Sequence, residues 1–319
     1  MEMNRVQFQH GLSSADFLKR YGTDELCESH VVASRWPEGF VCSRCSSKRY
    51  AMSFNGRRIR ECLDCGYQCS SIVGTVFGHI KLRLTQWFLG VYLMTQSKNA
   101  VAGLELLVRL LGVSYKTAWL VRHQLMQTML VRQAPRRLTD LVEIDHAYLG
   151  GERVGEKPGR GSPNKVPFVA AVQTDLAGKP HLMRLTPVAG FTEAALTDRA
   201  ALALAPGANV VSDGLGCFEA VTTVDQTTHE RHVVGAGSQA VKRPEFRWVN
   251  TMPGNLKTAF AGTYHALDYA KYAHRYLAEF AYRFNRRYDL PAMVPRLIHA
   301  DMHTAPLPRR VLCLSEAGN

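Results

Sequence analysis

With 319 residues, 46% apolar and 21% charged, the chain is long enough for two or three domains with a substantial core. No apolar run reaches membrane-spanning length and the start, Met-Glu-Met-Asn-Arg, is not a signal peptide, so we expect a cytoplasmic protein with no membrane partner. Residues 1–140 hold 19 Lys and Arg against 10 Asp and Glu, whereas residues 141–319 hold 20 against 17, and this basic first half predicts a nucleic-acid partner.

The first motif in chain order is a set of four cysteines arranged as two Cys-x-x-Cys pairs. They are Cys42, Cys45, Cys62 and Cys65. Each pair of thiolates can hold one side of a tetrahedral zinc ion, and residues 49–54 and 57–60 between them read as strands joined by a turn at Asn55-Gly56. We therefore expect a zinc ribbon, in which Cys69 is a buried small residue and not a ligand. The rival interpretation, disulfides in a secreted protein, lacks a secretion signal.

A helical stretch follows the ribbon. Residues 84–94 and 100–111 repeat apolar residues at helical spacing, and Ser114 is a candidate N-cap for a further helix over residues 115–131. That last helix carries four basic or polar side chains: Lys116, Arg122, His123 and Gln124. Helix, glycine-containing turn and basic second helix form the pattern of a helix-turn-helix, although an ordinary helical bundle contains such turns too.

Two apolar runs in the middle of the chain each end on an aspartate. Residues 141–144 lead into Asp145, and residues 209–212 lead into Asp213. Both runs are rich in β-branched residues and read as buried strands. A carboxylate at the end of a buried strand is costly unless a partner such as a metal ion compensates it. Two such carboxylates on neighbouring strands predict a divalent-metal site for phosphoryl transfer, with Mg²⁺ or Mn²⁺ as the ion.

The segments between the two aspartates predict how they meet. Strands are expected over residues 165–174 and 181–188, followed by a helix over residues 191–205 that Thr192 caps. Three meandering strands, a helix and a further strand follow the order of a ribonuclease H-like α/β fold with a mixed sheet. The first and fourth strands are adjacent in that fold, so the two aspartates would come together.

Several motifs now occur in a fixed order along the chain. Besides the cysteine pairs and the aspartates, they are Gly74-Thr75-Val76-Phe77, Leu84-Thr85-Gln86-Trp87-Phe88, Tyr148-Leu149-Gly150-Gly151, Gly262-Thr263-Tyr264-His265 and Arg283-Phe284-Asn285-Arg286-Arg287. Over residues 10–290 the chain resembles a bacterial insertion-sequence transposase of the zinc-ribbon, DDE-type (ISXO-like) group. The resemblance implies a DNA transposase that binds element ends and catalyses metal-dependent strand cleavage and strand transfer. It further implies double-stranded DNA partners, both element ends and target, and a homo-oligomer in the DNA complex.

The third acid of a DDE site is missing here. The family pattern calls for a carboxylate at the head of a helix with a basic residue seven positions later, and residues 248–257 contain no acid. Counting back seven from Lys257 gives Asn250, whose side chain would lie about 20° away on the same helix face. We therefore assign the third magnesium ligand to Asn250, hold Asn255 as the alternative, and expect Lys257 to bind a phosphate.

Other polar residues near the site have plainer interpretations. Glu143 shares a strand face with Asp145, so it either assists the metal or forms a salt bridge across the sheet. His146 is expected to point to the opposite face and to be structural. His229 and His232 are expected in a solvated polar loop, with contacts to DNA phosphates as the alternative.

The sequence thus predicts a multidomain α+β protein with two kinds of metal, structural zinc and catalytic Mg²⁺ or Mn²⁺, located in the cytoplasm at the nucleoid. Its expected parts are an N-terminal segment (1–35), the zinc ribbon (36–78), a helical DNA-binding region (79–134), the catalytic domain (135–290) and a tail (291–319). Two other function classes stay open: a transposase-derived DNA-binding regulator with an inactive core, and another ribonuclease H-like nuclease that lacks strand transfer.

Overall fold

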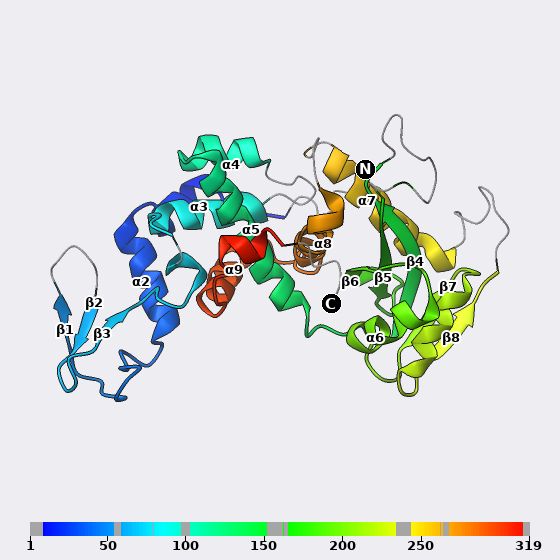
Figure 1. The fold of residues 1–319 in the computed structure, drawn as a ribbon, viewed down its shortest axis with the longest axis horizontal. Helices are drawn as coiled ribbons and strands as arrows, with labels where there is room; N and C mark the ends of the chain where they lie inside the picture. Colours follow the sequence, from blue (N-terminus) through cyan, green and yellow to red (C-terminus); the bar gives the residue numbers. More distant parts are fainter. Residues whose placement is uncertain are drawn as a thin grey trace. The chain divides into compact units, whose positions relative to one another are not determined.

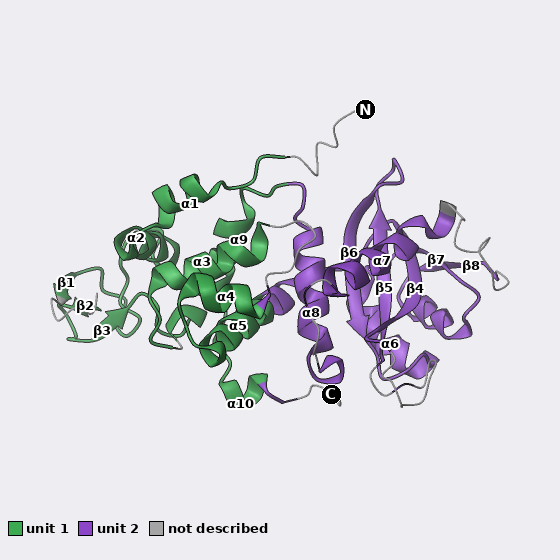
Figure 2. Cartoon of the chain, turned by 90° about the horizontal axis from the view of Figure 1, so that it is seen from above, with its two compact units in different colours: residues 1–97, 104–128, 289–312 green, residues 98–103, 129–288, 313–319 purple. Residues whose placement is uncertain are grey.

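The computed structural model describes residues 9–53, 59–78, 80–96, 103–151, 162, 165–233, 244–261, 263 and 268–314. The chain forms two compact units, which Figure 2 colours separately. Unit 1 holds residues 1–97, 104–128 and 289–312, and unit 2 holds residues 98–103, 129–288 and 313–319. No helix in the described ranges is both long enough and apolar enough to cross a membrane.

The zinc ribbon belongs to unit 1 and follows two short helices, α1 (Ser14–Tyr21) and α2 (Asp24–Arg35). Its strands are β1 (Tyr50–Ser53), β2 (Ile59–Cys62) and β3 (Gln68–Ser70), which form one antiparallel sheet in the order β1-β2-β3 (Figure 1). The expected hairpin of two strands is confirmed, while its turn at Asn55-Gly56 lies outside the described residues. The third strand was not predicted, because three residues are too few to show an alternating pattern.

The remaining helices of unit 1 pack around apolar side chains. They are the short helix η1 (Val76–Gly78), α3 (Leu84–Thr95), α4 (Leu104–Leu111), the first part of α5 (Tyr115–Gln133), α9 (Met293–Met302) and α10 (Arg309–Leu312). The predicted helices over residues 84–94 and 115–131 are confirmed, and the one over residues 100–111 is confirmed from Leu104 onward, while residues 100–102 lie outside the described residues. Gly112, between α4 and α5, has a φ of 63°, which favours glycine. Helix α5 continues to Gln133, two residues beyond the predicted end at Val131.

The prediction of a tail over residues 291–319 is wrong, because α9 and α10 are part of unit 1. In α9, Val294, Leu297 and Ile298 are fully buried. The side chain of Gln124 in α5 also holds this segment, since its amide nitrogen donates to the Leu307 carbonyl oxygen and its oxygen accepts from the Leu307 N–H, at 2.6 and 3.1 Å. The C-terminal segment therefore helps to form the core of unit 1.

Unit 2 is built on a five-stranded mixed sheet. Its strands are β4 (Leu141–Leu149), β5 (Val166–Thr174), β6 (Pro180–Pro187), β7 (Asn209–Ser212) and β8 (Thr228–Arg231). They lie in the order β6-β5-β4-β7-β8. Strand β5 is antiparallel to both of its neighbours, β4 and β6, whereas β7 is parallel to β4 and β8 is parallel to β7. This order confirms the expected ribonuclease H-like arrangement, in which the first strand pairs with the fourth.

Helices cover the two faces of this sheet, as Figure 1 shows. On one face, α6 (Glu193–Ala203), capped by Thr192, and the 3-10 helix η3 (Gly216–Thr223) pack on Val142 and Ile144. On the other face, α7 (Arg247–Ala261) contacts β4 and β5, and α8 (Tyr269–Phe284) contacts β5 and β6. Because side chains alternate along a strand, Glu143 points towards α7 and away from this α6 core.

Candidate active site and metal centres

The four cysteines of the two Cys-x-x-Cys pairs meet in unit 1. The Sγ atoms of Cys42 and Cys65 are 3.7 Å apart, and those of Cys45 and Cys62 are 3.5 Å apart. Four sulfurs bound about 2.3 Å from a tetrahedral zinc ion lie about 3.8 Å from one another. The thiols therefore fit a structural zinc ion, and Cys69, buried on β3, lies outside the set as expected.

Backbone N–H groups prepare these thiols for a metal ion. Burial raises the pKa of the Cys42 thiol, but hydrogen bonds from the Arg44 and Cys45 N–H groups and from the Cys65 and Cys45 thiols together lower it to about 6, while the pKa of Cys45 is raised to about 12. The Arg44 nitrogen is 3.4 Å from the Cys42 Sγ atom. Since a thiolate is the form that binds zinc, this arrangement favours metal binding near neutral pH.

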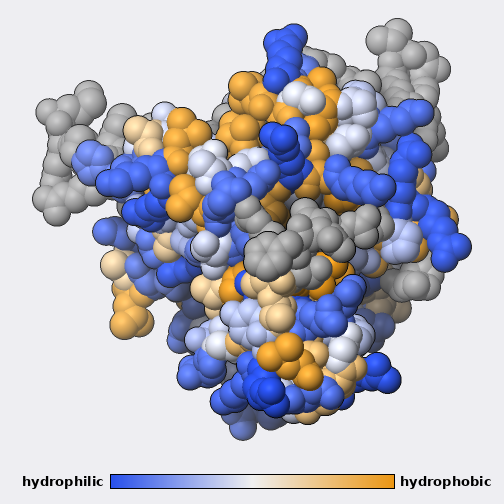
Figure 3. Space-filling view, turned by 90° about the vertical axis from the view of Figure 1, so that its left-hand side faces the viewer, coloured by the Kyte–Doolittle hydropathy of each residue, from blue (hydrophilic) through white to orange (hydrophobic). Residues whose placement is uncertain are grey.

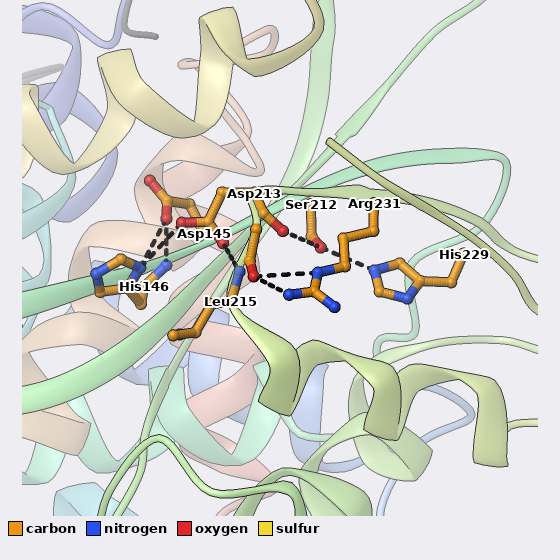
Figure 4. A network of polar contacts seen from close by, with 8 residues as sticks. Asp145, His146, Ser212, Asp213, Leu215, His229 and Arg231 are labelled. Carbon is orange, nitrogen blue, oxygen red and sulfur yellow. Dashed lines mark hydrogen bonds and ion pairs between the residues drawn. The ribbon is translucent and has the colours of Figure 1, made fainter. Parts of the chain in front are cut away.

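In unit 2 the structure brings Asp145 and Asp213 together. Asp145 lies on β4, and Asp213 directly follows β7, whose last residue, Ser212, pairs with Ile144. The imidazole of His146 lies between the two carboxylates, with Nδ1 3.0 Å from Asp145 Oδ1 and 3.5 Å from Asp213 Oδ2 (Figure 4). Two carboxylates and an imidazole within 4.8 Å are a donor set that fits a divalent cation.

His146 was expected to point to the face opposite Asp145 and to be structural, yet its Nδ1 atom lies 3.0 and 3.5 Å from carboxylate oxygens of Asp145 and Asp213. The pairing of β4 with β7 ends at Ile144 and Ser212, so among the described residues no strand pairs with His146 on that side, and the imidazole lies beside Asp213. Phe191 holds the ring in place through an edge contact, with centroids 5.2 Å apart. Strand alternation alone could not show this.

His146 and the carboxylates change one another's pKa. The neighbouring carboxylates of Asp145 and Asp213 raise the pKa of His146 to about 9, although burial lowers it. Burial raises the pKa of Asp213, but the His146 imidazole and the Leu215 N–H, 3.1 Å from Asp213 Oδ1, lower it below its ordinary value. The site therefore stabilises ionised carboxylates with a positive charge between them.

Helix α7 forms the other wall of a pocket beside Asp145. The pocket is lined by Asp145, His146, Ala147 and Tyr148 from β4 and by Val249, Asn250, Pro253, Gly254 and Lys257 from α7. Asn250 and Lys257 thus face the same space as the first aspartate, as the seven-residue spacing predicts, whereas Asn255 is exposed and lies outside this lining. Asn250 lies in the first turn of α7, which begins at Arg247 and continues through Pro253.

Glu143 has a role that the sequence did not indicate. Its side-chain oxygen Oε2 accepts hydrogen bonds from the backbone N–H groups of Trp248 and Val249, at 2.8 and 2.9 Å. The residue is only 4% exposed, and burial raises its pKa despite these two bonds. The carboxylate thus caps the start of α7, a role that neither expectation, a metal ligand or a salt bridge across the sheet, included.

A second polar network involves Ser212 and Gly214, the residues on either side of Asp213 in the sequence. The Nε2 atom of His229 is 2.7 Å from the Ser212 hydroxyl, and its Nδ1 atom is 3.2 Å from Glu219 Oε2. The Arg231 guanidinium donates to the Gly214 carbonyl oxygen, with Nε at 3.0 Å (Figure 4). His229 was expected in a solvated loop, but it belongs to strand β8 and its side chain is 2% exposed.

The helix-turn-helix residues divide into buried and exposed ones. Arg122, His123 and Gln124 are buried, and the Gln124 side chain is bound to Leu307. Of the four side chains noted in the helix-turn-helix pattern, these three therefore do not lie on an exposed surface of α5. Lys116, in the first turn of α5, is exposed. The polar side chains were misleading because α5 buries nearly every face between Ala118 and Met129.

Comparisons with known proteins agree with this architecture. Two family models match the chain: the ISXO2-like transposase domain over residues 137–285, and the transposase zinc-ribbon domain over residues 22–68. A relative from Halobacterium salinarum, described as an uncharacterized protein in transposable element ISH50, is 26% identical over 239 residues, which are 69% of this chain and 77% of the relative.

Two solved structures show distant likenesses. A simian T-cell lymphotropic virus intasome chain is 12% identical with a TM-score of 0.28, and the match covers 56% of this chain and 63% of that one. The Mos1 transposase paired-end complex is 13% identical with a TM-score of 0.24, and the match covers 62% of this chain and 74% of that one. By its two domain matches the chain belongs to the family of zinc-ribbon transposases that carry an ISXO2-like catalytic domain.

Proposed function

We propose that this transposase binds the ends of a mobile DNA element, cuts a strand there in a metal-dependent reaction, and joins the freed end to target DNA. The observation that supports this proposal most directly is the pocket beside Asp145. It combines that carboxylate with an amide, Asn250, and a cation, Lys257, while Asp213 lies across His146 from it. Carboxylates and an amide oxygen are ligands for Mg²⁺ or Mn²⁺, and a lysine is suited to a phosphate.

The residues would divide the work as follows. Asp145, Asp213 and Asn250 would hold the catalytic cation, which when bound would activate water or a DNA 3′-hydroxyl and neutralise charge on the phosphate. Asn250 contributes no charge, so the ligand set carries two negative charges where a DDE set carries three. Lys257 would hold the phosphate next to the cut, and the positions of these groups supply most of the catalysis.

Unit 1 would bind the DNA ends, with zinc supporting its ribbon. Most of the basic first half of the chain, residues 1–140, belongs to unit 1, and its excess of Lys and Arg suits the phosphates of the DNA backbone. Figure 3 shows a face of the molecule on which hydrophilic and apolar residues are intermixed. Exposed residues of unit 1, such as Lys116 at the start of α5, would contact the DNA backbone. Two or more copies of the chain would assemble in the DNA complex.

A cleavage assay on a labelled element end tests the catalytic part. Asp145→Ala and Asp213→Ala should abolish Mg²⁺- or Mn²⁺-dependent cleavage and leave end binding intact, because each removes a charged ligand. Asp198→Ala is the matched control, since Asp198 is exposed on α6. Normal cleavage by either active-site variant would show that the site is misassigned.

The same assay separates the other function classes. A wild-type protein that binds ends but never cuts them would be the regulator with an inactive core. Cleavage without joining to target DNA would indicate a ribonuclease H-like nuclease. The two family matches favour the transposase over both.

A further inference from the structure

The start of helix α7 is held by a carboxylate from a distant strand. The first N–H groups of any helix lack partners inside that helix, so they need an acceptor from elsewhere. Here Glu143 Oε2 accepts from the N–H groups of Trp248 and Val249, the second and third residues of α7, across 105 and 106 positions of the chain. A buried carboxylate at this end of a helix is also favoured by the helix dipole.

The strand that supplies this cap also supplies an aspartate of the active site. Glu143 and Asp145 lie two positions apart on β4 and therefore share one face, which is the face that α7 covers. Asn250 follows Val249 directly, so it lies in the turn of α7 that Glu143 holds. The position of Asn250 relative to Asp145 is thus set through two hydrogen bonds of 2.8 and 2.9 Å.

We propose that Glu143 is a positioning residue that, through the first turn of α7, holds Asn250 and Lys257 opposite Asp145 and so sets both metal affinity and cleavage rate. This inference rests on the proposed function, because it requires Asn250 to serve the metal site. Glu143 would touch neither the metal nor the DNA. Its Oε2 atom already accepts two N–H bonds, so direct ligation through that atom would cost both of them.

Two substitutions of Glu143 separate positioning from direct metal binding. Glu143→Gln keeps the length of the side chain and an oxygen that can accept from both N–H groups, but it removes the charge. Glu143→Asp keeps the charge but is one methylene too short to reach α7 in the same geometry. Positioning predicts that Glu143→Asp is the more damaging change, whereas a metal ligand predicts the reverse.

The experiment uses the full-length protein and measures Mn²⁺ binding by electron paramagnetic resonance alongside cleavage of a labelled end. We expect Glu143→Asp to lower the cleavage rate at saturating Mn²⁺ by roughly 100-fold and to weaken Mn²⁺ binding, because a small displacement of a catalytic group has effects of that size. Glu143→Gln should lose only about tenfold, since it keeps the acceptor. Affinity for end DNA should be unchanged in both variants.

Three results would overturn the proposal. The first is a loss of thermal stability with normal Mn²⁺ affinity and a normal rate per folded molecule, which would leave Glu143 a purely structural role. The second is Mn²⁺ binding that survives in Glu143→Asp but is abolished in Glu143→Gln, as a ligand would behave. The third is a full effect in Glu193→Asp, the matched control in the exposed first turn of α6.

A double variant distinguishes failure of this inference from failure of the proposed function. If Glu143 acts through Asn250, then adding Glu143→Asp to Asn250→Ala should weaken Mn²⁺ binding little further, because both changes remove the same contribution. Fully additive effects on Mn²⁺ affinity would refute the positioning role while leaving the metal site intact. Normal Mn²⁺ binding and cleavage in Asn250→Ala alone would instead refute the assignment of the third ligand.

Discussion

Substitution of His146 tests how the two aspartates are compensated when no divalent cation is bound. The carboxylates of Asp145 and Asp213, which form ion pairs with the imidazole, raise the pKa of His146 from 6.5 to about 9. Each pKa unit corresponds to about 1.4 kcal/mol, so the protonated imidazole stabilises the fold by up to about 3 kcal/mol. The side chain is 20% exposed, so screening by solvent removes only part of this.

The direction of the pH dependence follows from a pKa that is higher in the folded state. Below pH 6.5 the imidazole is protonated in both states, and its full stabilising effect is present. Between pH 6.5 and about 9 the unfolded chain has lost this proton while the folded protein still holds it, so the stabilisation falls as pH rises. Above about pH 9 it is gone.

The assay compares wild type with His146→Asn at pH 6 and pH 9 in buffer without divalent cations. Hydrogen exchange of amides in β4 and β7 gives the free energy of opening of the catalytic sheet separately from unit 1. The difference between the two proteins should be about 2–3 kcal/mol at pH 6 and should nearly vanish at pH 9. His181→Asn, at an exposed position, is the control. A difference that stays constant between the two pH values would refute the reasoning.

Three further predictions concern the two metal sites and the DNA. Cys62→Ser should release the structural zinc and unfold the ribbon while the catalytic sheet stays folded; zinc retained on metal analysis would contradict this. Asn250→Ala should slow cleavage by about 100-fold and Asn250→Asp should keep part of the activity, whereas Asn255→Ala should stay within about twofold because that side chain is exposed; the reverse order would contradict the ligand assignment. Affinity for end DNA should fall steeply with salt, with a log–log slope of about −0.9 per phosphate contact, and a flat response would exclude a mainly electrostatic interface.

Much of the catalytic fold could be predicted because its pattern is local. The strands before Asp145 and Asp213 are short segments rich in β-branched residues, and Thr192 caps α6 as its sequence indicates. Strand β8 was missed because Thr228-His229-Glu230-Arg231 is an edge strand with a largely polar surface, which reads as a loop. Helix α9 was missed because its apolar residues lie close together in the sequence and no side chain caps its start, so only its packing in unit 1 reveals it.

The candidate site could be predicted only where spacing along one element decides the geometry. The seven residues from Asn250 to Lys257 place both on one face of α7 whatever the rest of the fold does. The position of His146 depends on where the pairing of β7 with β4 ends. The role of Glu143 depends on a helix 105 positions later in the chain, so no local pattern could reveal it.

Unit 1 is interrupted in the sequence, because residues 289–312 return to it after residues 129–288 of unit 2. During synthesis the ribosome therefore releases the catalytic sheet before α9 exists, and the core of unit 1 stays incomplete until the last helices emerge. A nascent chain of this length contains all five strands of the sheet in unit 2 but an incomplete unit 1. A premature stop codon just after residue 288 would fix the protein in that state, and its main structural damage would fall on the helices encoded near the start of the gene.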